Sequence, residues 1–429
     1  MTRPATLAGW LAYIETLHAK PIAMGLERVA SVAQRMSSAI ECPVITVAGT
    51  NGKGSTCAIL EAIHRHAGFR TGLYTSPHLL RFNERVRVNG ADVTDEALVA
   101  AFDAVESARV AAPAEATPLT YFEFSTLAAL QLFAQARPDV LILEVGLGGR
   151  LDAVNILDAD VAVVTTIDID HVQYLGATRE SIGREKAGIF RAGKRAICGD
   201  RDPPRSLVEH ADSIGAPLWR IGHDYAYAVE GTHWRYTGPA SARYGLPFPA
   251  LRGAYQLDNA ATALAALDAL RDRLPVPAGA VRDGLVHVVL PGRFQVLPGR
   301  PTIVLDVAHN PHAARALAAA LGSMGFHPQT FAVFGMLEDK DIESVAAILR
   351  PRVDRWYIAP LPGPRGAPAA RIIRALHGAG IGADAIREFE NIGDAFEAAR
   401  SDANDTDRIA AFGSFLTVAA ALAAARQRG

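Results

Sequence analysis

The stretch VAGTNGKGST, residues 47–56, begins in a β-branched and apolar run, CPVITVAG (42–49), and leads into a helix-like segment, CAILEAIHRHAG (57–68). Glycines let a backbone turn its N–H groups inward around phosphate oxygens, and a helix N-terminus adds a favourable dipole. Lys53 can reach the outer phosphates of a nucleotide. The stretch therefore predicts a phosphate loop that follows a buried parallel strand, rather than an ordinary glycine-rich turn.

The spacing of this loop differs from the usual GxxxxGK[ST], because Gly54 separates Lys53 from the hydroxyl residues Ser55 and Thr56. Either hydroxyl can ligate Mg²⁺. The chain has no NKxD tetrad to read guanine, which argues against a GTPase switch, while a simple kinase stays open on the loop alone. The residues that we expect to contact the nucleotide are Asn51, Gly52, Lys53, Gly54 and Ser55.

Composition limits the class of protein. The 429 residues carry 43 basic and 45 acidic side chains, so no broad positive field exists for nucleic-acid phosphates. The length predicts two domains, or three. Cys42, Cys57 and Cys198 are odd in number and far apart, so they form neither a disulfide framework nor a CxxC metal pair. A reducing cytoplasm fits them, and we expect a cytoplasmic protein.

Two apolar segments could in principle be membrane or targeting elements, but neither has the required pattern. Residues 1–20 do not read as a signal peptide, because Glu15 and His18 break the apolar stretch. The longest apolar run, residues 409–425, falls short of the about 20 residues that span a bilayer. A buried strand followed by a helix explains this run better, and we expect no membrane partner.

Strand-like and helix-like segments alternate along the chain, which predicts an α/β protein. In the first half, Asn89-Gly90 marks a hairpin within residues 85–94, and Thr94 is the expected N-cap of the following helix. Other expected elements there are strands at 139–146 and 160–167, helices at 121–136 and 259–270, and a hairpin within 223–238 that turns at Glu230-Gly231.

A proline- and glycine-rich stretch, residues 290–301, marks the expected boundary between two domains. Residues 1–295 are predicted to form a P-loop ATPase domain with a mostly parallel sheet. Residues 296–429 are predicted to form a smaller Rossmann-like α/β domain. Its expected parallel strands are 302–308, 330–336, 355–361, 386–390 and 408–414.

The loop GTNGKGS (49–55) resembles that of folylpolyglutamate synthases and dihydrofolate synthases. These enzymes belong to the wider Mur ligase family, which joins a carboxylate to an amine with ATP. Nine further segments resemble that family in its order across most of the chain: TSPHL (75–79), TYFEF (120–124), LEVGLGGRLDAVN (143–155), DHVQYLG (170–176), REKAGIF (184–190), LRGAYQLDNAA (251–261), PGRF (291–294), LDVAHNP (305–311) and FGSF (412–415).

The resemblance implies two Mg²⁺ sites, one held by Ser76, Glu144 and His171 and the other by Ser55. Glu144 lies at the end of an expected strand, where parallel sheets carry functional groups, although a carboxylate capping the next turn is an alternative. Mg²⁺ prefers oxygen, so a histidine hydrogen-bonded to Asp168 or Asp170 is the alternative for His171.

Lys186, in REKAGIF, is implied by the resemblance to be carboxylated. A neutral amine and CO₂ give a carbamate, an anion that can sit near magnesium where an ammonium would be repelled. The alternative is an ordinary lysine on a helix surface, paired with a nearby acid.

The resemblance also assigns nucleotide contacts to Gln256, Asn259, Arg293 and Asp306. For Gln256 and Asn259, helix capping is the alternative. The resemblance also places His309 and Ser414 towards an incoming glutamate. The expected catalytic residues are Lys53, Lys186 and His309.

Two segments, MGLERV (24–29) and TYFE (120–123), resemble those that hold the pterin-bearing substrate in two-activity members of the family, and Leu151, Asp152 and Ala153 are expected to complete that pocket. Tyr121 and Phe122 can stack on a pterin ring, although aromatic residues at helical spacing often belong to a core. The expected substrate contacts are Met24, Gly25, Leu26, Glu27, Thr120, Tyr121, Phe122, Glu123, Leu151, Asp152 and Ala153.

These features together predict an ATP-dependent ligase that adds L-glutamate to dihydropteroate and to folates through an acyl phosphate, in folate biosynthesis. The alternatives are an elongation-only folylpolyglutamate synthase, a muramyl-type peptide ligase, and an ATP-binding switch or scaffold without ligase activity. Glu144, His171 and Lys186 beside the loop favour catalysis over a switch. We expect a monomer with small-molecule substrates and no nucleic-acid partner.

Overall fold

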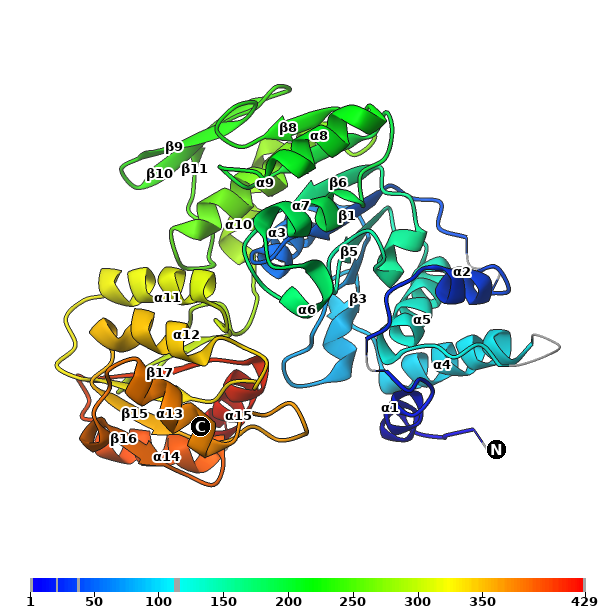
Figure 1. Ribbon diagram of the computed structural model, residues 1–429. Helices are drawn as coiled ribbons and strands as arrows, with labels where there is room; N and C mark the ends of the chain where they lie inside the picture. Colours follow the sequence, from blue (N-terminus) through cyan, green and yellow to red (C-terminus); the bar gives the residue numbers. More distant parts are fainter. Residues whose placement is uncertain (1–2, 21, 37–38, 112–115, 427–429) are drawn as a thin grey trace. The chain divides into compact units, whose positions relative to one another are not determined.

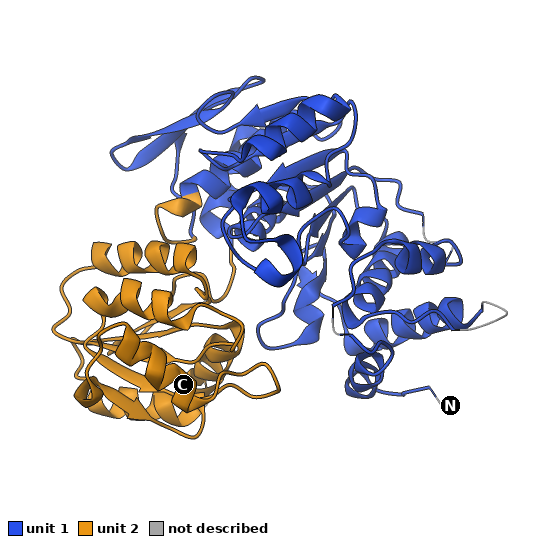
Figure 2. Ribbon diagram, in the orientation of Figure 1, with its two compact units in different colours: residues 1–250, 257–288 blue, residues 251–256, 289–429 orange. Residues whose placement is uncertain are grey.

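The computed structural model describes residues 3–20, 22–36, 39–111 and 116–426. The chain divides into two compact units, shown in Figures 1 and 2. Unit 1 contains residues 1–250 and 257–288, and unit 2 contains residues 251–256 and 289–429. The chain therefore passes from unit 1 to unit 2 between residues 288 and 289. The domain boundary expected between residues 295 and 296 stays a prediction.

Unit 1 is built on an eight-stranded sheet with the order β4-β3-β2-β5-β1-β6-β7-β8. All neighbouring strands from β2 to β8 in this order are parallel, and β3 and β4 add an antiparallel edge. The bounds are β1 (Val44–Ala48), β2 (Thr71–Tyr74), β3 (Val86–Val88), β4 (Ala91–Asp92), β5 (Val140–Glu144), β6 (Val161–Val164), β7 (Arg195–Cys198) and β8 (Leu218–Arg220). The predicted mostly parallel sheet is confirmed.

Two helices of unit 1, α4 and α5, begin where the sequence predicted them, while α3 and α9 begin at Lys53 and Tyr255, before the predicted segments 57–68 and 259–270. Thr94 caps α4 by accepting a hydrogen bond from the Ala97 N–H, and α5 covers the whole predicted span. The bounds are α1 (Leu7–Glu15), α2 (Glu27–Ala33), α3 (Lys53–His66), α4 (Asp95–Val110), α5 (Tyr121–Ala136), α6 (Val172–Leu175), α7 (Arg179–Ala187), α8 (Arg205–Ile214), α9 (Tyr255–Ala269), which starts in unit 2, and α10 (Ala278–His287), with short 3₁₀ turns at Phe82–Arg85 and Ala153–Ile156.

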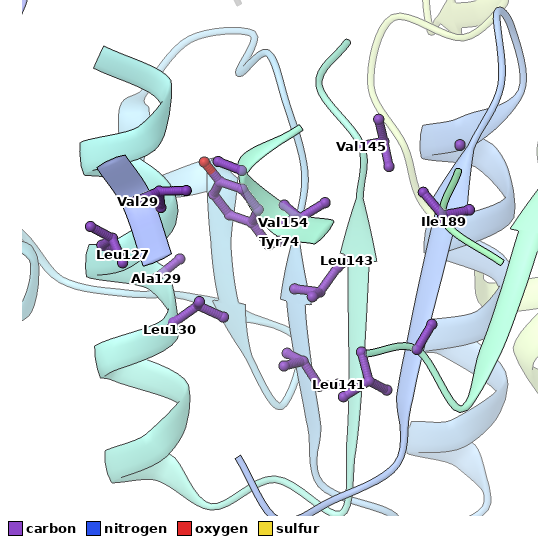
Figure 3. Close-up of a cluster of buried hydrophobic side chains, with 14 of the residues drawn as sticks. Val29, Tyr74, Leu127, Ala129, Leu130, Leu141, Leu143, Val145, Val154 and Ile189 are labelled. Carbon is purple, nitrogen blue, oxygen red and sulfur yellow. The ribbon is translucent and has the colours of Figure 1, made fainter. Parts of the chain in front are cut away.

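The core of unit 1 lies between the sheet and its helices. Figure 3 shows Leu127 and Leu130 of α5 facing Leu141 and Leu143 of β5. Val29 of α2 joins the same cluster (Figure 3). Buried strands with apolar side chains on both faces are what a parallel sheet covered by helices requires. This core fixes the strand ends from which the candidate site is built.

Both predicted hairpins of unit 1 form, with one difference. Asn89 and Gly90 turn between β3 and β4 with φ angles of 50° and 79°. In the second hairpin, β9 (Ala226–Glu230) and β10 (His233–Thr237), Glu230 is still paired with His233. The turn therefore consists of Gly231 and Thr232, one residue beyond the predicted turn. A third strand, β11 (Ala242–Leu246), pairs with β10 and was not predicted.

Unit 2 holds a six-stranded sheet with the order β12-β13-β17-β14-β15-β16. The five predicted parallel strands are confirmed as β13 (Thr302–Asp306), β14 (Thr330–Phe334), β15 (Arg355–Ile358), β16 (Ile386–Glu388) and β17 (Arg408–Phe412). The sixth strand, β12 (Gln295–Leu297), is antiparallel to β13. The proline- and glycine-rich stretch 290–301 therefore also contains a strand, because Gln295–Leu297 forms a short antiparallel hairpin with Ile303–Leu305.

The helices of unit 2 form two packed groups. Helix α11 packs on α12 and α12 on α13, while α14 packs on α15. The bounds are α11 (Pro311–Ser323), α12 (Ile342–Leu349), α13 (Ala369–Gly378), α14 (Ile392–Asp402) and α15 (Phe415–Arg426), with short 3₁₀ turns at Arg350–Arg352 and Ala383–Ala385. The apolar run 409–425 forms β17 and α15 as predicted. Within the described residues, the structure has no helix long and apolar enough to cross a membrane.

Candidate active site

The predicted phosphate loop connects β1 to α3. The strand ends at Ala48 and the helix starts at Lys53, with Gly49 and Gly52 at φ angles of 150° and 90°. A Cβ atom on Gly49 would lie 1.8 Å from Thr165 Oγ1, and one on Gly52 would lie 2.4 Å from Asn259 Oδ1. Both positions therefore need glycine, for the backbone angle and for the close approach of a neighbouring side chain.

The segment after β6 holds the phosphate loop in place. Thr165 and Thr166 each donate a side-chain hydrogen bond to the Asn51 carbonyl, at 2.7 and 3.1 Å. Thr50 donates its N–H to the Thr166 carbonyl at 2.7 Å and accepts the Asp168 N–H on its hydroxyl at 3.0 Å. Thr165 and Thr166 were not predicted from the sequence to support the loop. The available signal was a pair of hydroxyl residues at the end of an otherwise apolar strand.

The loop's charged and hydroxyl side chains have different surroundings. Lys53 is half-buried and donates hydrogen bonds from Nζ to the carbonyls of Gly49, at 3.1 Å, and Thr50, at 3.4 Å. Its ammonium thus lies over its own loop. Ser55 and Thr56 are both buried, and the Thr56 hydroxyl makes no hydrogen bond among the described residues. Both hydroxyls therefore stay candidates for Mg²⁺.

Glu144 and Ser76 come together at the same edge of the sheet as the loop. Glu144 ends β5, which lies between β1 and β2, and Ser76 follows β2. The Ser76 N–H donates to Glu144 Oε2 at 3.1 Å, and the Glu144 side chain is buried. Parallel strands deliver their carboxyl ends to one edge, which explains why residues 68 positions apart meet.

His171 directly precedes α6, with a φ angle of 51°. Its Nε2 lies 3.9 Å from Asp170 Oδ1, and its N–H donates to the same oxygen at 2.8 Å. Among the described residues, no three His, Cys, Asp or Glu side chains group closely enough to hold a metal ion. A Mg²⁺ ion at this edge would thus depend on serine hydroxyls, water and phosphate oxygens besides Glu144, a donor set that suits this ion.

Lys186 lies in the last turn of α7, and its side chain is only 3 % exposed. The alternative of a lysine on the helix surface is therefore wrong. Burial, together with the ammonium of Lys53, lowers the pKa of Lys186 to about 7, while Asp170 and Asp152 act in the opposite direction. A lysine in this environment is a neutral amine in a large fraction of molecules near neutral pH.

The segment Gly146–Asn155 packs against the end of α7. A Cβ atom on Gly149 would lie 2.8 Å from the Glu185 carbonyl oxygen, and the Arg150 N–H donates to that carbonyl at 2.8 Å. Asp152, between Leu151 and Ala153, is buried and accepts N–H groups of Leu147 and Val154. Burial raises the pKa of Asp152 to about 7.

The segments predicted to hold the substrate meet near Gly146 and Gly148. A Cβ atom on Gly146 would lie 2.7 Å from the Phe122 ring, and the Met24 methyl carbon lies 3.8 Å from the Cβ position of Gly148. Leu26 is the N-cap position of α2 and Glu27 its first residue, while Gly25 has a φ angle of 140°. Residues 24–27, 120–123 and 146–153 thus belong to one region of unit 1.

Two of the predicted substrate residues have structural partners of their own. Thr120 and Glu123 form a capping box, in which each side chain accepts the other's N–H, at the start of α5. Tyr121 and Phe122 are half-buried and pack against the core. The guanidinium of Arg85 lies 5.4 Å from the Tyr121 ring centroid.

Gln256 and Asn259 are both buried near the start of α9. They occupy the second and fifth positions of a helix that begins at Tyr255, so neither is its N-cap residue. Asn259 lies directly against Gly52 of the phosphate loop.

The predicted residues of unit 2 gather where β13 and β17 end. Asp306 is buried, which raises its pKa, and it accepts N–H groups of Phe294 and Ala308, each at 2.8 Å. The Arg293 guanidinium lies 5.0 Å from the Phe415 ring centroid. The ring centroids of His309 and Phe415 are 6.3 Å apart. Ser414 immediately precedes Phe415 and accepts the Leu416 N–H. Phe415, which belongs to FGSF but was not a predicted site residue, thus contacts both Arg293 and His309.

A phosphate loop with a strand-end carboxylate and a buried lysine in one unit, followed by a second α/β unit, defines an ATP-dependent ligase of the Mur type. Residues 47–267 match the Mur ligase middle domain, and residues 292–415 match the Mur ligase, glutamate ligase domain. The chain belongs to the dihydrofolate synthase/folylpolyglutamate synthase branch of this family.

The similarity to relatives covers nearly the whole chain. The dihydrofolate synthase/folylpolyglutamate synthase of Escherichia coli (strain K12) is 49% identical over 96% of this chain and 94% of its own length. The enzyme of the same name from Haemophilus influenzae is 40% identical over 96% of each. The solved structure of E. coli FolC in complex with DHPP and ADP has a TM-score of 0.93 at 46% identity, covering 100% of both chains.

A further solved structure is a bifunctional folylpolyglutamate synthase/dihydrofolate synthase with Mn, AMPPNP and L-glutamate bound. It has a TM-score of 0.90 at 46% identity and covers 99% of this chain and 100% of its own.

Proposed function

We propose that this chain adds L-glutamate to dihydropteroate and to folates that already carry glutamate. The observation that carries the proposal is a phosphate loop, the strand-end carboxylate of Glu144 and the buried Lys186, whose pKa the Lys53 ammonium helps to lower, in one unit with the segments that resemble a pterin site. Relatives of high identity are named for both activities, and solved relatives hold DHPP with ADP, and AMPPNP with L-glutamate.

In the proposed reaction, the substrate carboxylate attacks the γ-phosphorus of ATP, which gives an acyl phosphate and ADP. The amine of glutamate then attacks the acyl carbon, an amide bond forms, and phosphate leaves. Lys53 and the loop N–H groups offset the charge that moves between the phosphates. Mg²⁺, when bound, supplies further positive charge at these oxygens.

The proposed metal ligands are oxygens at the carboxyl ends of neighbouring strands. Ser76, Glu144 and His171 would hold one Mg²⁺ ion and Ser55 another. Mg²⁺ retains several waters and takes few protein ligands, so the sparse donor set at this edge fits it.

We further propose that Lys186 is carboxylated. Its lowered pKa leaves a reactive neutral amine, which attacks CO₂ through Nζ and releases one proton to form the carbamate. The product anion would lie where the Lys53 ammonium now disfavours a second positive charge.

The remaining predicted residues complete the proposal. Asn51, Gly52, Gly54, Gln256, Asn259, Arg293 and Asp306 would contact the nucleotide. His309 and Ser414 would contact glutamate, in keeping with the match of this unit to a glutamate ligase domain. The segments at 24–27, 120–123 and 151–153 would hold the pterin-bearing substrate.

A substrate panel tests the proposal. ADP release is measured with ATP, L-glutamate and one acid: dihydropteroate, tetrahydrofolate or a muropeptide. Release with the first two acids supports the two-activity enzyme. Release with tetrahydrofolate alone leaves an elongation-only synthase, release with the muropeptide leaves a muramyl-type ligase, and ATP binding without release leaves a switch or scaffold. A monomeric state and a cytoplasmic location stay predictions, and light scattering after gel filtration tests the first.

A further inference from the structure

Arg179, the first residue of α7, makes contacts that no role described above uses. Its guanidinium donates from Nε to the Ile167 carbonyl at 2.9 Å and from Nη2 to both Asp200 carboxylate oxygens, at 3.2 and 3.3 Å. Nη1 and Nη2 also donate to Asp202, at its carboxylate and its carbonyl. One side chain thus ties the start of α7 to the segments that follow β6 and β7.

Asp200 holds the same peptide segment from the other side. It lies two residues after β7, its side chain is 10 % exposed, and it accepts the Ile167 N–H at 2.7 Å. The N–H of Ile167 therefore bonds to Asp200 while its carbonyl bonds to Arg179. Both backbone groups of one residue are fixed by an ion pair whose members come from two different elements.

Ile167 lies directly between two residues that hold the phosphate loop. The Thr166 carbonyl accepts the Thr50 N–H, and the Asp168 N–H donates to the Thr50 hydroxyl. A shift at Ile167 would move both of these contacts, so the ion pair acts on the loop through one intervening segment. The Ile167 side chain is itself buried, which leaves this segment little freedom to compensate.

The helix that Arg179 starts also carries Lys186 in its last turn. The guanidinium is therefore joined to the phosphate loop through Ile167 and to the buried lysine through the rigid helix. We propose that Arg179 and Asp200 form a positioning pair that sets the nucleotide-binding loop and its spacing from Lys186. This inference rests on the proposed function and adds to it a pair that touches neither substrate nor nucleotide.

The geometry requires arginine rather than any cation. The acceptors at Ile167, Asp200 and Asp202 lie around one planar guanidinium, whose five N–H donors are held in a fixed fork. A lysine ammonium on a flexible stem can neutralise Asp200 but cannot bond all three in their present places. Arg179→Lys therefore keeps the charge and removes the geometry. Asp200→Asn keeps the shape and removes the charge.

The experiment compares these two variants with Arg70→Lys. Arg70 pairs with Asp139 through Nε and Nη2, and these two residues directly precede β2 and β5, at the end of the sheet opposite to the loop. The variant Arg70→Lys therefore loses a similar two-pronged bond far from the loop. For each variant, KM is measured for ATP, L-glutamate and tetrahydrofolate, and affinity for AMPPNP is measured by calorimetry. The thermal unfolding midpoint is recorded in parallel.

We expect Arg179→Lys and Asp200→Asn each to raise KM for ATP and weaken AMPPNP binding on the order of tenfold, with KM for tetrahydrofolate nearly unchanged. The double variant should lose no more than the worse single variant, because either change already frees Ile167. Arg70→Lys should leave all three KM values unchanged.

Unchanged ATP and AMPPNP affinity in both variants would overturn the inference. So would equal rises in all three KM values that follow the loss of thermal stability, since that pattern marks a structural role alone. Wild-type protein that binds AMPPNP but releases no ADP with any acid would defeat the proposed function. The AMPPNP arm would still test the positioning pair in that case.

Discussion

Arg28 donates from Nη2 to Glu123 Oε1 at 2.9 Å, although 95 residues separate them in sequence. The Glu123 side chain is only 4 % exposed, and its other oxygen accepts the Thr120 N–H in the capping box of α5. Arg28 also donates to the Ala23 carbonyl. The two segments that resemble a pterin site, MGLERV and TYFEF, are therefore joined by one ion pair. This pair fixes where α2 lies on the first turn of α5.

The first prediction is that Glu123→Ala lowers the free energy of unfolding by roughly 1–3 kcal/mol, since a buried charged hydrogen bond and a cap are lost together. Thermal and urea unfolding measure the change. Glu96→Ala is the control, because Glu96 is an exposed acid in the first turn of α4. An equal effect in both variants would show that Glu123 contributes only its helix-end charge.

Much of unit 1 could be predicted because its signals are local. The β-branched run before residue 49 predicted β1, Asn89-Gly90 predicted the β3–β4 turn, and Thr94 predicted the start of α4. Each of these elements depends on residues within a few positions of itself. Strand β12 was missed although its partner, β13, follows directly in the chain, because three residues among prolines and glycines are too few to show an alternating pattern.

The site was predictable where a strand end carries it, as with Glu144, and less so where tertiary packing decides. Lys186 stands in a polar helix, REKA, that looks solvent-facing, and its burial comes from tertiary packing, in which Gly149 lies against the backbone of Glu185 and Lys186. Thr165 bonds to the Asn51 carbonyl across 114 residues, and a single sequence carries no pairing signal for such a contact.

The second prediction concerns the loop lysine. Lys53→Ala should reduce ADP release at least on the order of a hundredfold, because a positive charge aimed at the transferred phosphate is lost. The unfolding midpoint should stay close to that of the wild type, since Lys53 is half-buried at the start of α3 and its ammonium bonds to two carbonyls of its own loop. Lys194→Ala, which removes an exposed lysine paired with Asp160, is the control. Wild-type turnover in Lys53→Ala would remove the phosphate-loop assignment.

The third prediction concerns Lys186. CO₂ removal at acid pH should inactivate the enzyme, because protonation favours loss of the carbamate, and bicarbonate above about pH 7 should restore activity. Lys186→Ala should be nearly inactive under both conditions. Intact mass spectrometry under native conditions should show the added CO₂. An unmodified lysine in fully active protein would contradict the prediction.

The fourth prediction links acid stability to His64. This side chain is fully buried in α3, and burial lowers its pKa to about 4 from an ordinary value of 6.5. Between pH 6.5 and about pH 4, His64 is therefore protonated in the unfolded chain but not in the folded chain. Stability is therefore complete above pH 6.5 and falls as the pH drops towards 4, by up to roughly 3 kcal/mol from this group.

His64→Gln should remove that part of the pH dependence, seen as a smaller drop in the unfolding midpoint between about pH 7 and about pH 5. His66→Gln, an exposed histidine two residues further along α3, should leave the drop unchanged. Equal drops in wild type and His64→Gln would show that other groups carry the acid sensitivity.

The last prediction is that Phe122 favours dihydropteroate over longer folates. Its ring lies against Gly146, two residues after Glu144, and its centroid is 6.0 Å from that of Tyr74. The first reaction needs a benzoyl carboxylate at the γ-phosphate, while the second needs the same rings displaced by one glutamate. One phosphate centre can serve both only if the pterin has two alternative positions, and Phe122 would line the position used by dihydropteroate.

Phe122→Ala should therefore lower kcat/KM for dihydropteroate by an amount equivalent to about 1–3 kcal/mol, because stacking and apolar contact are lost. The same variant should lower kcat/KM for tetrahydrofolate less. Gly146→Ala is the matched test, since its methyl group would push the ring aside without removing it. It should show the same preference with a smaller loss. Steady-state kinetics on both acids decides the matter. Equal losses on both substrates would place Phe122 outside the pterin site and leave the ligase assignment intact.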